Sequence, residues 1–422
     1  MPGESFNVSL FDLTMCMSDA MDLVSPVVVD HHKKVALIAD YFGEEMGLPK
    51  EKQTDLTLAG LLHDSGAISL KERIDALTFE LENPHKHSEL GYLMLKGFPF
   101  YSEIATIIRY HHASYKEYGT KVPLESHIVH LADRISVLIN PDRQILAQKD
   151  YIMEKINDKK GDAFAPEIVE AFEKVSEKES FWLDIVSPDV GEILSSRAKS
   201  NAVSISLDIN GLLEIGELFT RVIDFRSVFT STHSGGVAAS AEALAGKIGF
   251  SDLECLQMRL AGYLHDLGKL AVPKEILEKP GKLTEDEFRV IRTHAYYTYR
   301  ILERLPELET INKWGALHHE KIDGKGYPFH CEGEKLFLGS RIVAVADVFT
   351  ALTEDRPYRG GLDPEKVENI LNNMVNEKAL DSGVVEVLMK NYKEVDDIRK
   401  NAQLNSKLKY QDTKEEETHV RG

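Results

Sequence analysis

Hydrophobic residues recur every three to four positions along most of the chain, a spacing typical of amphipathic helices. Residues 254–263 and 104–112 show it clearly, while the strict alternation that marks a β-strand is scarce. Thr284 is followed three positions later by Glu287, and this capping box predicts a helix that starts there and runs through His294. We therefore predict an all-α fold.

The same pattern occurs twice. When the chain is displaced by 202 positions against itself, three polar residues coincide: His31 with His233, His63 with His265, and Asp64 with Asp266. After a further shift of five positions, a lone His and a His pair 24 positions later also coincide: His87 with His294, His111 with His318, and His112 with His319. Residues 128–133 resemble residues 342–347, and the two segments end in Asp133 and Asp347. This ordered set predicts a tandem duplication.

We expect the two copies to be separate helical domains, over residues 1–200 and 205–400. Pro, Gly and Ser cluster between residues 187 and 204, which places the boundary there. Residues 401–422 are polar and charged, and we expect a flexible tail that frays. A chain of 422 residues is long for one core and ample for two domains of about 200 residues each.

Composition narrows the class of protein. No apolar run is long enough to cross a bilayer, and the N-terminus lacks a basic segment followed by an apolar one, so we expect a cytoplasmic protein without a membrane partner. The three cysteines, Cys16, Cys255 and Cys331, are widely separated and odd in number, which argues against a disulfide framework.

The net charge of −19 argues against binding to a nucleic-acid polymer or an anionic membrane. An anionic small substrate would need local cations or metal ions to overcome this field.

The C-terminal copy carries a set of seven potential metal ligands: His233, His265, Asp266, His294, His318, His319 and Asp347. Imidazole and carboxylate together suit Mn²⁺, Fe²⁺, Zn²⁺ or Ni²⁺ better than Ca²⁺ or Mg²⁺. Seven ligands are too many for one ion with an open position, but they suit two ions bridged by a carboxylate. Any one of these histidines alone would more often be a hydrogen-bonded core residue. The ordered set favours a metal centre.

Over residues 210–395 the sequence resembles the HD-GYP subgroup of the HD phosphohydrolases. The motifs are LHDLGK at 264–269, KPGKLT at 279–284, HHEKIDGKGYP at 318–328, and ADVFTALT at 346–353 with RPYR at 356–359. Members of this subgroup are helical hydrolases that open cyclic di-GMP, or in some cases 3′,3′-cyclic GMP-AMP, to linear dinucleotides. The resemblance therefore implies a metal-dependent phosphodiesterase of cyclic dinucleotides.

The resemblance also implies roles for individual residues. One metal would be held by His233, His265, Asp266 and Asp347, and the second by His294, His318 and His319. Asp266 would bridge the two ions, and a hydroxide between them would attack phosphorus. Lys269 would contact the scissile phosphate and help protonate the departing sugar oxygen, from a position one turn beyond Asp266 on the same helix. Arg356 and Arg359 would supply further phosphate contacts.

A loop over residues 323–328 follows the His318-His319 helix that we expect. Its glycines, Gly324 and Gly326, permit positive φ and close approach to a ligand, and Tyr327 offers an aromatic face or a hydroxyl. We expect Asp323, Gly324, Gly326 and Tyr327 to contact substrate. The alternative for such a loop taken alone is a plain turn.

One position departs from the family. Some members carry a Glu four residues before the first His, where it serves a third metal. Phe229 occupies that position here, which favours a site for two divalent transition metals.

The N-terminal copy keeps the ligands but loses the substrate groups. Its candidate metal site consists of His31, His63, Asp64, His87, His111, His112 and Asp133. The position of Lys269 is taken by Ala67, and no Gly-Tyr-Pro loop follows His112. This combination favours a regulatory, sensing or dimerising domain over a second catalytic one, and a homo-oligomer stays open.

Two other functions compete. A nucleotidase or dNTP phosphohydrolase of the wider HD superfamily is disfavoured by the complete Gly-Tyr-Pro loop. A non-catalytic nucleotide-binding signalling module is disfavoured by the intact ligands and by Lys269. The tandem arrangement without a receiver domain resembles enzymes that act on 3′,3′-cyclic GMP-AMP, and this tilts the expected substrate that way. The native metal and any further cleavage of the product stay open.

Overall fold

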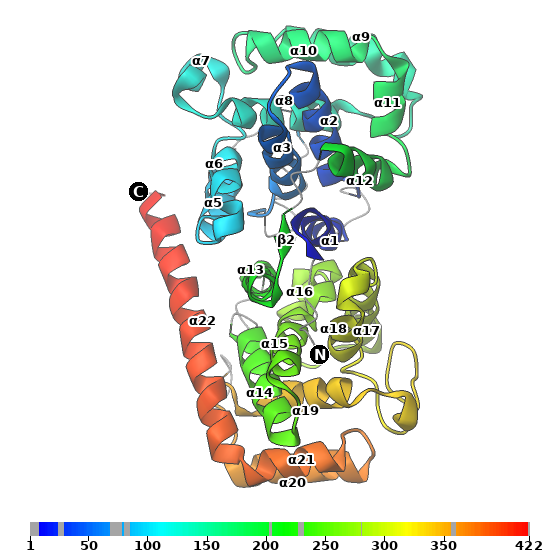
Figure 1. The fold of residues 1–422 in the computed structure, drawn as a ribbon, viewed down its shortest axis with the longest axis vertical. Coiled ribbons are helices and arrows are strands. Elements are labelled where there is room, and N and C mark those ends of the chain that lie inside the picture. Colours follow the sequence, from blue (N-terminus) through cyan, green and yellow to red (C-terminus); the bar gives the residue numbers. More distant parts are fainter. Residues whose placement is uncertain are drawn as a thin grey trace. The chain divides into compact units, whose positions relative to one another are not determined.

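The computed structural model describes residues 8–23, 29–67, 78–79, 85–201, 205–226, 232–279, 281–355 and 360–420. These residues are almost entirely helical (Figure 1), which confirms the predicted all-α fold. The only strands among them are β1 (Val8–Ser9) and β2 (Ser206–Leu207), which pair in a two-stranded sheet. Phe229, Arg356 and Arg359, to which the sequence analysis assigned importance, lie outside the described residues.

The chain divides into two compact units, an N-terminal unit over Ser9–Ser206 and a C-terminal unit over Leu207–His419. The helices of the N-terminal unit are α1 (Leu10–Asp22), α2 (His31–Glu45), α3 (Lys50–Leu62), α5 (His85–Leu95), η2 (Pro99–Tyr101), α6 (Ser102–Arg109), α7 (Tyr115–Tyr118), η3 (Gly119–Lys121), α8 (Leu124–Leu138), η4 (Ile145–Gln148), α9 (Lys149–Asn157), α10 (Pro166–Ser176), α11 (Glu179–Ile185) and α12 (Val190–Asn201). The centre of the unit is α2, which packs against α3 and α8.

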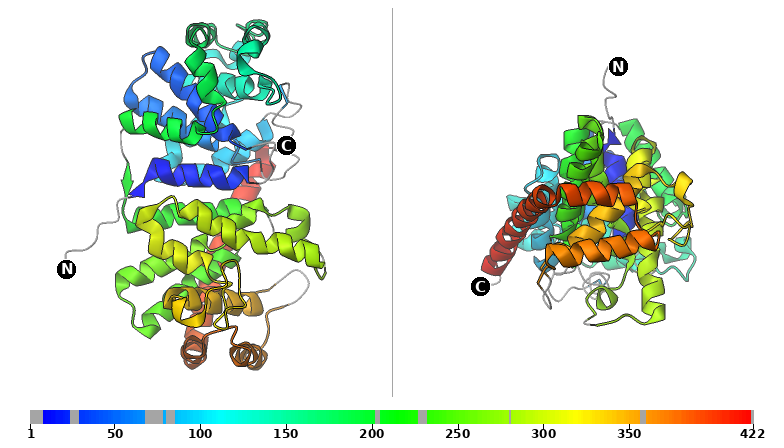
Figure 2. Two further views of the ribbon diagram at one scale, coloured as in Figure 1. Left: turned by 90° about the vertical axis from the view of Figure 1, so that its right-hand side faces the viewer. Right: turned by 90° about the horizontal axis from the view of Figure 1, so that it is seen from below.

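The C-terminal unit repeats this arrangement. Its helices are α13 (Ile209–Arg226), α14 (His233–Ile248), α15 (Asp252–Leu264), η5 (Leu267–Ala271), α16 (Lys274–Leu277), α17 (Glu285–Leu302), η6 (Pro306–Leu308), α18 (Glu309–Ala316), η7 (Gly333–Lys335), α19 (Leu338–Thr353), α20 (Pro364–Asn376), α21 (Ser382–Lys390) and α22 (Tyr392–Val420). Helix α14 packs against α15 and α19, as α2 packs against α3 and α8. Helices α20 and α21 lie side by side (Figure 2) and have no counterpart in the sequence repeat.

The predicted capping box is present at the start of α17. The Thr284 hydroxyl accepts the Glu287 N–H, and the Glu287 carboxylate accepts the Thr284 N–H. Two otherwise unpaired backbone donors are thereby satisfied, and the helix begins at Glu285 and carries His294 in its middle. Among the described residues no helix combines the length and the apolar character that crossing a membrane requires.

Two segments differ from the sequence-based expectation. The Pro-, Gly- and Ser-rich stretch is mostly helix α12, and the break between the units follows it, after Ser206. The expectation of a frayed tail from residue 401 is wrong for residues 401–409, which continue α22. There Gln403 and Ser406 face Gly236 and Gly235 of α14, so packing against small residues orders a segment whose composition is that of a tail.

Candidate metal centre

The seven predicted ligands of the C-terminal unit come together from five helices. His233 begins α14, His265 and Asp266 follow the end of α15, His294 lies within α17, His318 and His319 follow the end of α18, and Asp347 lies on α19. Their ligand atoms form three overlapping groups, each within 4.8 Å: His294, His318 and His319; His233, His265 and Asp347; and His265, Asp266 and His318. The expectation that the His pair lies on a helix is wrong, because α18 ends at Ala316 and the pair occupies the turn that follows.

Three of the imidazoles are fixed in one tautomer by the backbone. The Nδ1–H groups of His265, His294 and His318 donate to the carbonyl three residues earlier, at 2.8, 2.6 and 2.7 Å. A carbonyl can only accept, so in the neutral ring the lone pair lies on Nε2. All three Nε2 atoms are buried and lack a hydrogen-bond partner. Buried polar atoms without partners are costly, and a bound cation would satisfy them.

Asp266 lies between the two histidine groups. Its Oδ2 is 3.1 Å from His265 Nε2, and its Oδ1 is 3.3 Å from His294 Nε2. The Oδ1 atom is also buried without a hydrogen-bond partner. Burial alone would raise the pKa of Asp266, but His265 and Lys269 outweigh it and hold the pKa well below its usual range. The carboxylate is therefore ionised, with one oxygen facing each group.

A close backbone contact sets the distance between α17 and the His265-Asp266 turn. A Cβ atom at Gly268 would lie 2.0 Å from the His294 carbonyl oxygen, so only glycine fits there. Thr298 adds two hydrogen bonds, accepting from the Gly268 N–H at 2.9 Å and donating to the His265 carbonyl at 3.1 Å. The N-terminal unit repeats the contact, because a Cβ at Gly66 would lie 2.1 Å from the His87 carbonyl.

His233 differs from the other histidines because it lies between two carboxylates. Its Nε2 is 3.0 Å from Asp347 Oδ1, and its Nδ1 is 3.1 Å from Glu354 Oε2. Burial would lower the pKa of His233, but Glu354 and Asp347 outweigh it and raise the pKa to about 10. Glu354 is only 4% exposed and also accepts a hydrogen bond from Gln403 of α22 at 3.2 Å. If Nε2 binds an ion, the Nδ1–H still donates to Glu354, an arrangement that orients a histidine ligand.

The remaining histidines are suited to metal binding at neutral pH. Burial lowers the pKa of His294, lowers that of His318 to about 3, and lowers that of His319 well below its ordinary value. Neutral rings with an available nitrogen are the form that coordinates transition metals. The residues present thus fit one or two divalent ions.

Lys269 lies on the accessible side of the centre. It belongs to the 3₁₀-helix η5, and Asp266 is the residue that caps this short helix, so the expectation of a shared α-helix is wrong. The tighter 3₁₀ turn places residues three apart above one another, and the Lys269 ammonium pairs with Asp266. The Lys269 side chain is 20% exposed and that of Asp347 is 18% exposed, whereas Asp266 is 3% exposed. The centre is open to solvent on this side.

The loop after His319 is held by Glu320, a residue that the sequence analysis did not single out. Its buried carboxylate accepts the N–H groups of Phe329 at 2.6 Å and Cys331 at 3.0 Å. Within the loop, Gly326 approaches the backbone so closely that a Cβ there would lie 2.3 Å from the Lys321 nitrogen. Gly324 adopts the predicted positive φ, +73°. Its place directly after the His pair was the available signal for Glu320.

The loop turns Tyr327 towards the metal ligands. The Tyr327 ring centroid is 4.8 Å from that of His319, with an interplanar angle of 33°, and the Arg292 guanidinium lies 4.6 Å from the other ring centre contact of Tyr327. Asp323 has a different contact, because its Oδ1 accepts the Lys325 N–H at 3.0 Å and shapes the turn. Arg292, two positions before His294, is a cation beside the centre that the sequence analysis missed.

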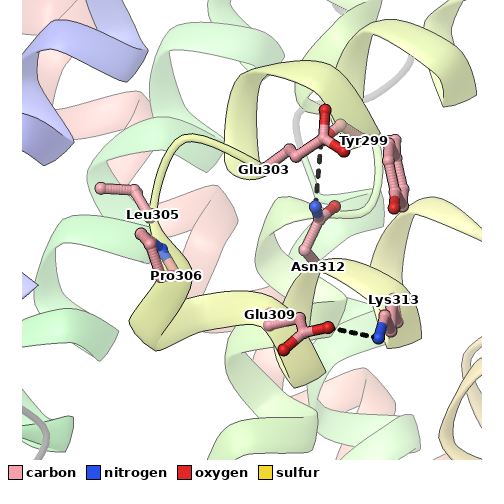
Figure 3. A pocket seen from close by; sticks show the side chains of 7 residues that line it. All are labelled: Tyr299, Glu303, Leu305, Pro306, Glu309, Asn312 and Lys313. Carbon is pink, nitrogen blue, oxygen red and sulfur yellow. Dashed lines mark hydrogen bonds and ion pairs between the residues drawn. The ribbon is translucent and has the colours of Figure 1, made fainter.

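A separate surface pocket of about 250 Å³ lies among α17, η6 and α18 (Figure 3). It contains none of the seven ligands. Lys313 on its wall is paired with Glu309 at 2.5 Å, and Glu303 adds a second carboxylate. This acidic lining is unsuited to an anionic substrate.

Comparisons with known proteins agree with the duplicated fold. Residues 28–138 and residues 217–384 each match the HD domain family. A solved structure of a cyclic GMP-AMP specific phosphodiesterase from Vibrio cholerae superimposes with a TM-score of 0.66 at 24% identity, covering 92% of this chain and 98% of that chain.

Curated relatives resemble the chain over different lengths. The 3′3′-cGAMP-specific phosphodiesterase 1 of Vibrio cholerae is 29% identical over 402 residues, 92% of each protein. The 3′3′-cGAMP-specific phosphodiesterase 3 of the same organism is 34% identical over 60% of this chain and 54% of its own length. A cyclic di-GMP phosphodiesterase of Thermotoga maritima is 32% identical over 44% of this chain and 51% of its own length.

We expect Glu354→Gln to weaken metal binding, because Gln removes the charge that orients His233 and favours its Nδ1–H. The affinity of the weaker-binding ion should fall by about 10- to 100-fold. Competition with a chelator of known affinity measures it. Asp355→Asn is the matched control, since it removes an adjacent carboxylate that is exposed and accepts from the Gly361 N–H.

The metal-stripped protein gives a second test of Glu354. The pKa of His233 is about 10 in the folded chain against an ordinary 6.5, so its pairing stabilises the fold below about pH 6.5 and is lost as the pH rises through 10. Denaturant unfolding across this window should show that loss in the wild type and much less of it in Glu354→Gln. Equal pH profiles would contradict the role of Glu354.

For the loop, we expect Glu320→Ala to lower the free energy of unfolding by about 1.5–3 kcal/mol, because two backbone donors lose a charged acceptor. Glu320→Gln keeps one strong acceptor and should fall between Ala and the wild type. Urea unfolding followed by circular dichroism measures the series. A wild-type value for the Ala variant would mean that the loop does not depend on this carboxylate.

Proposed function

Because the chain belongs to the HD domain family and to its HD-GYP group, we propose that it is a metal-dependent phosphodiesterase that opens cyclic dinucleotides to linear ones. The observation that supports this most is the cluster of buried, unpartnered Nε2 and carboxylate atoms beside Lys269 and the Gly-Tyr-Pro loop. The arrangement supplies both of the things that phosphodiester hydrolysis needs, a site for divalent cations and an adjacent site for an anionic substrate.

We further propose 3′,3′-cyclic GMP-AMP as the preferred substrate. The relative that resembles both halves of the chain, over 92% of each protein, is specific for 3′3′-cGAMP. The cyclic di-GMP phosphodiesterase of Thermotoga maritima resembles 44% of this chain. Similarity over the whole tandem arrangement therefore favours the mixed dinucleotide.

In this proposal His233, His265, Asp266 and Asp347 hold one divalent transition ion, and His294, His318 and His319 hold the second, with Asp266 shared. Such a pair of ions supplies an activated water and neutralises charge on the phosphate. Mn²⁺ and Fe²⁺ suit the mixed nitrogen and oxygen ligands, as do Ni²⁺ and Zn²⁺.

The chain's own residues bind and orient the substrate. The Lys269 ammonium, on the open side, attracts a phosphate oxygen and can donate a proton to the departing sugar oxygen. Arg292 offers a second cation next to Tyr327, and the Tyr327 ring offers an apolar face for a base. Gly324 and Gly326 keep the loop narrow enough for its backbone to approach a ligand. Arg356 and Arg359 are proposed as further phosphate contacts.

A nucleotidase or dNTP phosphohydrolase is the alternative enzyme, and a non-catalytic nucleotide-binding module is the alternative outside enzymes. Chromatography of products separates the three, since they predict a linear dinucleotide, a nucleoside or nucleotide from monomers, and no product.

We expect the purified chain to convert 3′,3′-cyclic GMP-AMP to a linear dinucleotide faster than cyclic di-GMP, with Mn²⁺ or with Fe²⁺ under anaerobic conditions. The double substitution His265→Ala with Asp266→Ala should abolish turnover and release at least one ion, because it removes the shared carboxylate. Full turnover in that variant would exclude the proposed centre, and faster cyclic di-GMP hydrolysis would exclude the proposed preference.

We expect Lys269→Ala to retain wild-type metal content and to lower kcat by about 100-fold or more, because the ammonium stabilises charge in the transition state without binding the ions. Lys274→Ala is the matched control, since Lys274 is a nearby lysine paired with Glu278. Metal stoichiometry and turnover are measured on the same preparation. Unchanged turnover, or loss of activity together with loss of metal, would rule out the role.

A further inference from the structure

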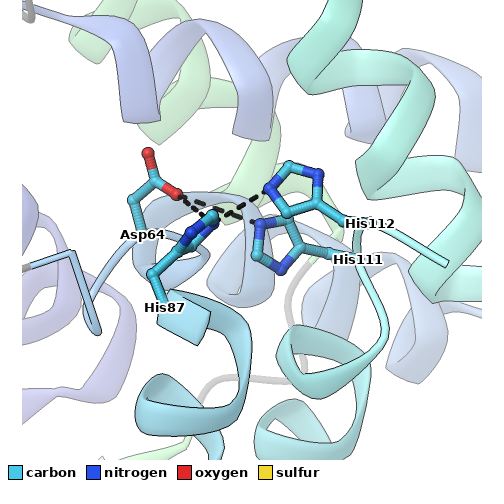
Figure 4. Close-up of side chains that lie close together, drawn as sticks. All are labelled: Asp64, His87, His111 and His112. Carbon is cyan, nitrogen blue, oxygen red and sulfur yellow. Dashed lines mark hydrogen bonds and ion pairs between the residues drawn. The ribbon is translucent and has the colours of Figure 1, made fainter. Parts of the chain in front are cut away.

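In the N-terminal unit, Asp64, His87, His111 and His112 point towards one another (Figure 4). Asp64 Oδ1 is 3.2 Å from His87 Nε2 and 3.9 Å from His111 Nε2, and the Nε2 atoms of His87 and His112 are 2.9 Å apart. Four ligands about 2.0–2.1 Å from one ion, at the corners of a tetrahedron, lie about 3.3 Å from one another. The four side chains therefore already have the spacing of a tetrahedral site.

The ligand atoms of this group are available. The His111 Nδ1–H donates to the Ile108 carbonyl at 2.6 Å, so the lone pair of the neutral ring lies on Nε2. His111 Nε2 and Asp64 Oδ1 are buried and have no hydrogen-bond partner. The His111 side chain is fully buried and that of Asp64 is 6% exposed. Unpartnered polar atoms at this depth point to a ligand that the four residues share.

The other half of the duplicated site has changed. Asp133, the counterpart of Asp347, accepts from the neighbouring Arg134, with Nη2 at 2.5 Å and Nε at 3.2 Å from its Oδ2. Val348 occupies the position of Arg134 in the C-terminal unit. His31 Nδ1 pairs with the Ser136 hydroxyl at 3.1 Å, whereas His233 Nδ1 faces the Glu354 carboxylate. One change adds a positive charge and the other omits a negative one.

Formal charge therefore differs between the two centres. The C-terminal centre has three carboxylates, Asp266, Asp347 and Glu354, against the ammonium of Lys269. The N-terminal centre has two, Asp64 and Asp133, against the guanidinium of Arg134. Two divalent ions would leave the N-terminal centre with a large uncompensated positive charge in a buried place, which is costly. One divalent ion leaves about a single charge.

We infer that the N-terminal unit binds one divalent transition ion through Asp64, His87, His111 and His112, and that this ion is structural. All four side chains are buried, so the site is closed, whereas catalytic sites keep an open position. Ala67 stands where Lys269 would supply a cation for substrate. The ion joins the turn after α3 to α5 and to the turn after α6. Three imidazoles and one carboxylate suit Zn²⁺ or Co²⁺.

The test compares His111→Ala with His31→Ala in the full chain after equilibration with Co²⁺ and removal of unbound ion. His111→Ala should bind one ion fewer than the wild type, and His31→Ala should bind as many as the wild type. The visible bands of four-coordinate Co²⁺ should be present in the wild type and in His31→Ala and absent in His111→Ala. An unchanged ion count in His111→Ala, or the loss of an ion in His31→Ala, would overturn the inference.

His87→Asn provides a second variant, because His87 is 7% exposed and its removal disturbs the core less than that of the fully buried His111. It should also lose one ion and the four-coordinate bands. The ions of the C-terminal unit report whether the rest of the chain is folded, since a loss confined to one ion requires that unit to be intact. A structural ion further predicts that a chelator lowers the unfolding temperature of His265→Ala with Asp266→Ala but has a smaller effect when His111→Ala is added.

Discussion

The metal centres depend on one repeated hydrogen bond, from a histidine Nδ1–H to the carbonyl three residues earlier. It occurs at His63, His111, His265, His294 and His318, with distances from 2.6 to 2.8 Å. In four of these cases the histidine follows the end of a helix, where carbonyls lack partners within the helix. The bond satisfies such a carbonyl and fixes the tautomer and the direction of the ring at the same time.

This bond explains why two units of the same ancestry keep the same ligand geometry while their chemistry diverges. The helices that carry the ligands, and the glycine contacts at Gly66 and Gly268, are common to both units. What differs is charge near the ligands, since Lys269 is replaced by Ala67 and Val348 by Arg134. A few side chains on an unchanged scaffold are enough to favour an open centre in one unit and a closed one in the other.

Much of this could be predicted from the sequence. Helical periodicity gave the fold class, and the repeated spacing of His and Asp gave the ligand sets, because both are local patterns. Periodicity does not mark where a helix ends, so it missed that His318 and His319 follow α18 and that Lys269 lies in a 3₁₀ turn. Glu354 could not be recognised because its environment includes Gln403, which is 49 positions away on a helix with the composition of a tail.

The acidic character of the chain sharpens the role of its few local cations. With a net charge of −19, long-range attraction of an anionic dinucleotide is unfavourable, so binding must come from groups at the centre itself. Lys269 and Arg292 are such groups, and each lies against a partner, Asp266 or the ring of Tyr327. Cations bound at Asp266 would compete with Lys269 for that carboxylate and let its ammonium turn towards a phosphate. Substrate binding would thereby depend on metal binding, and the order would follow from electrostatics alone.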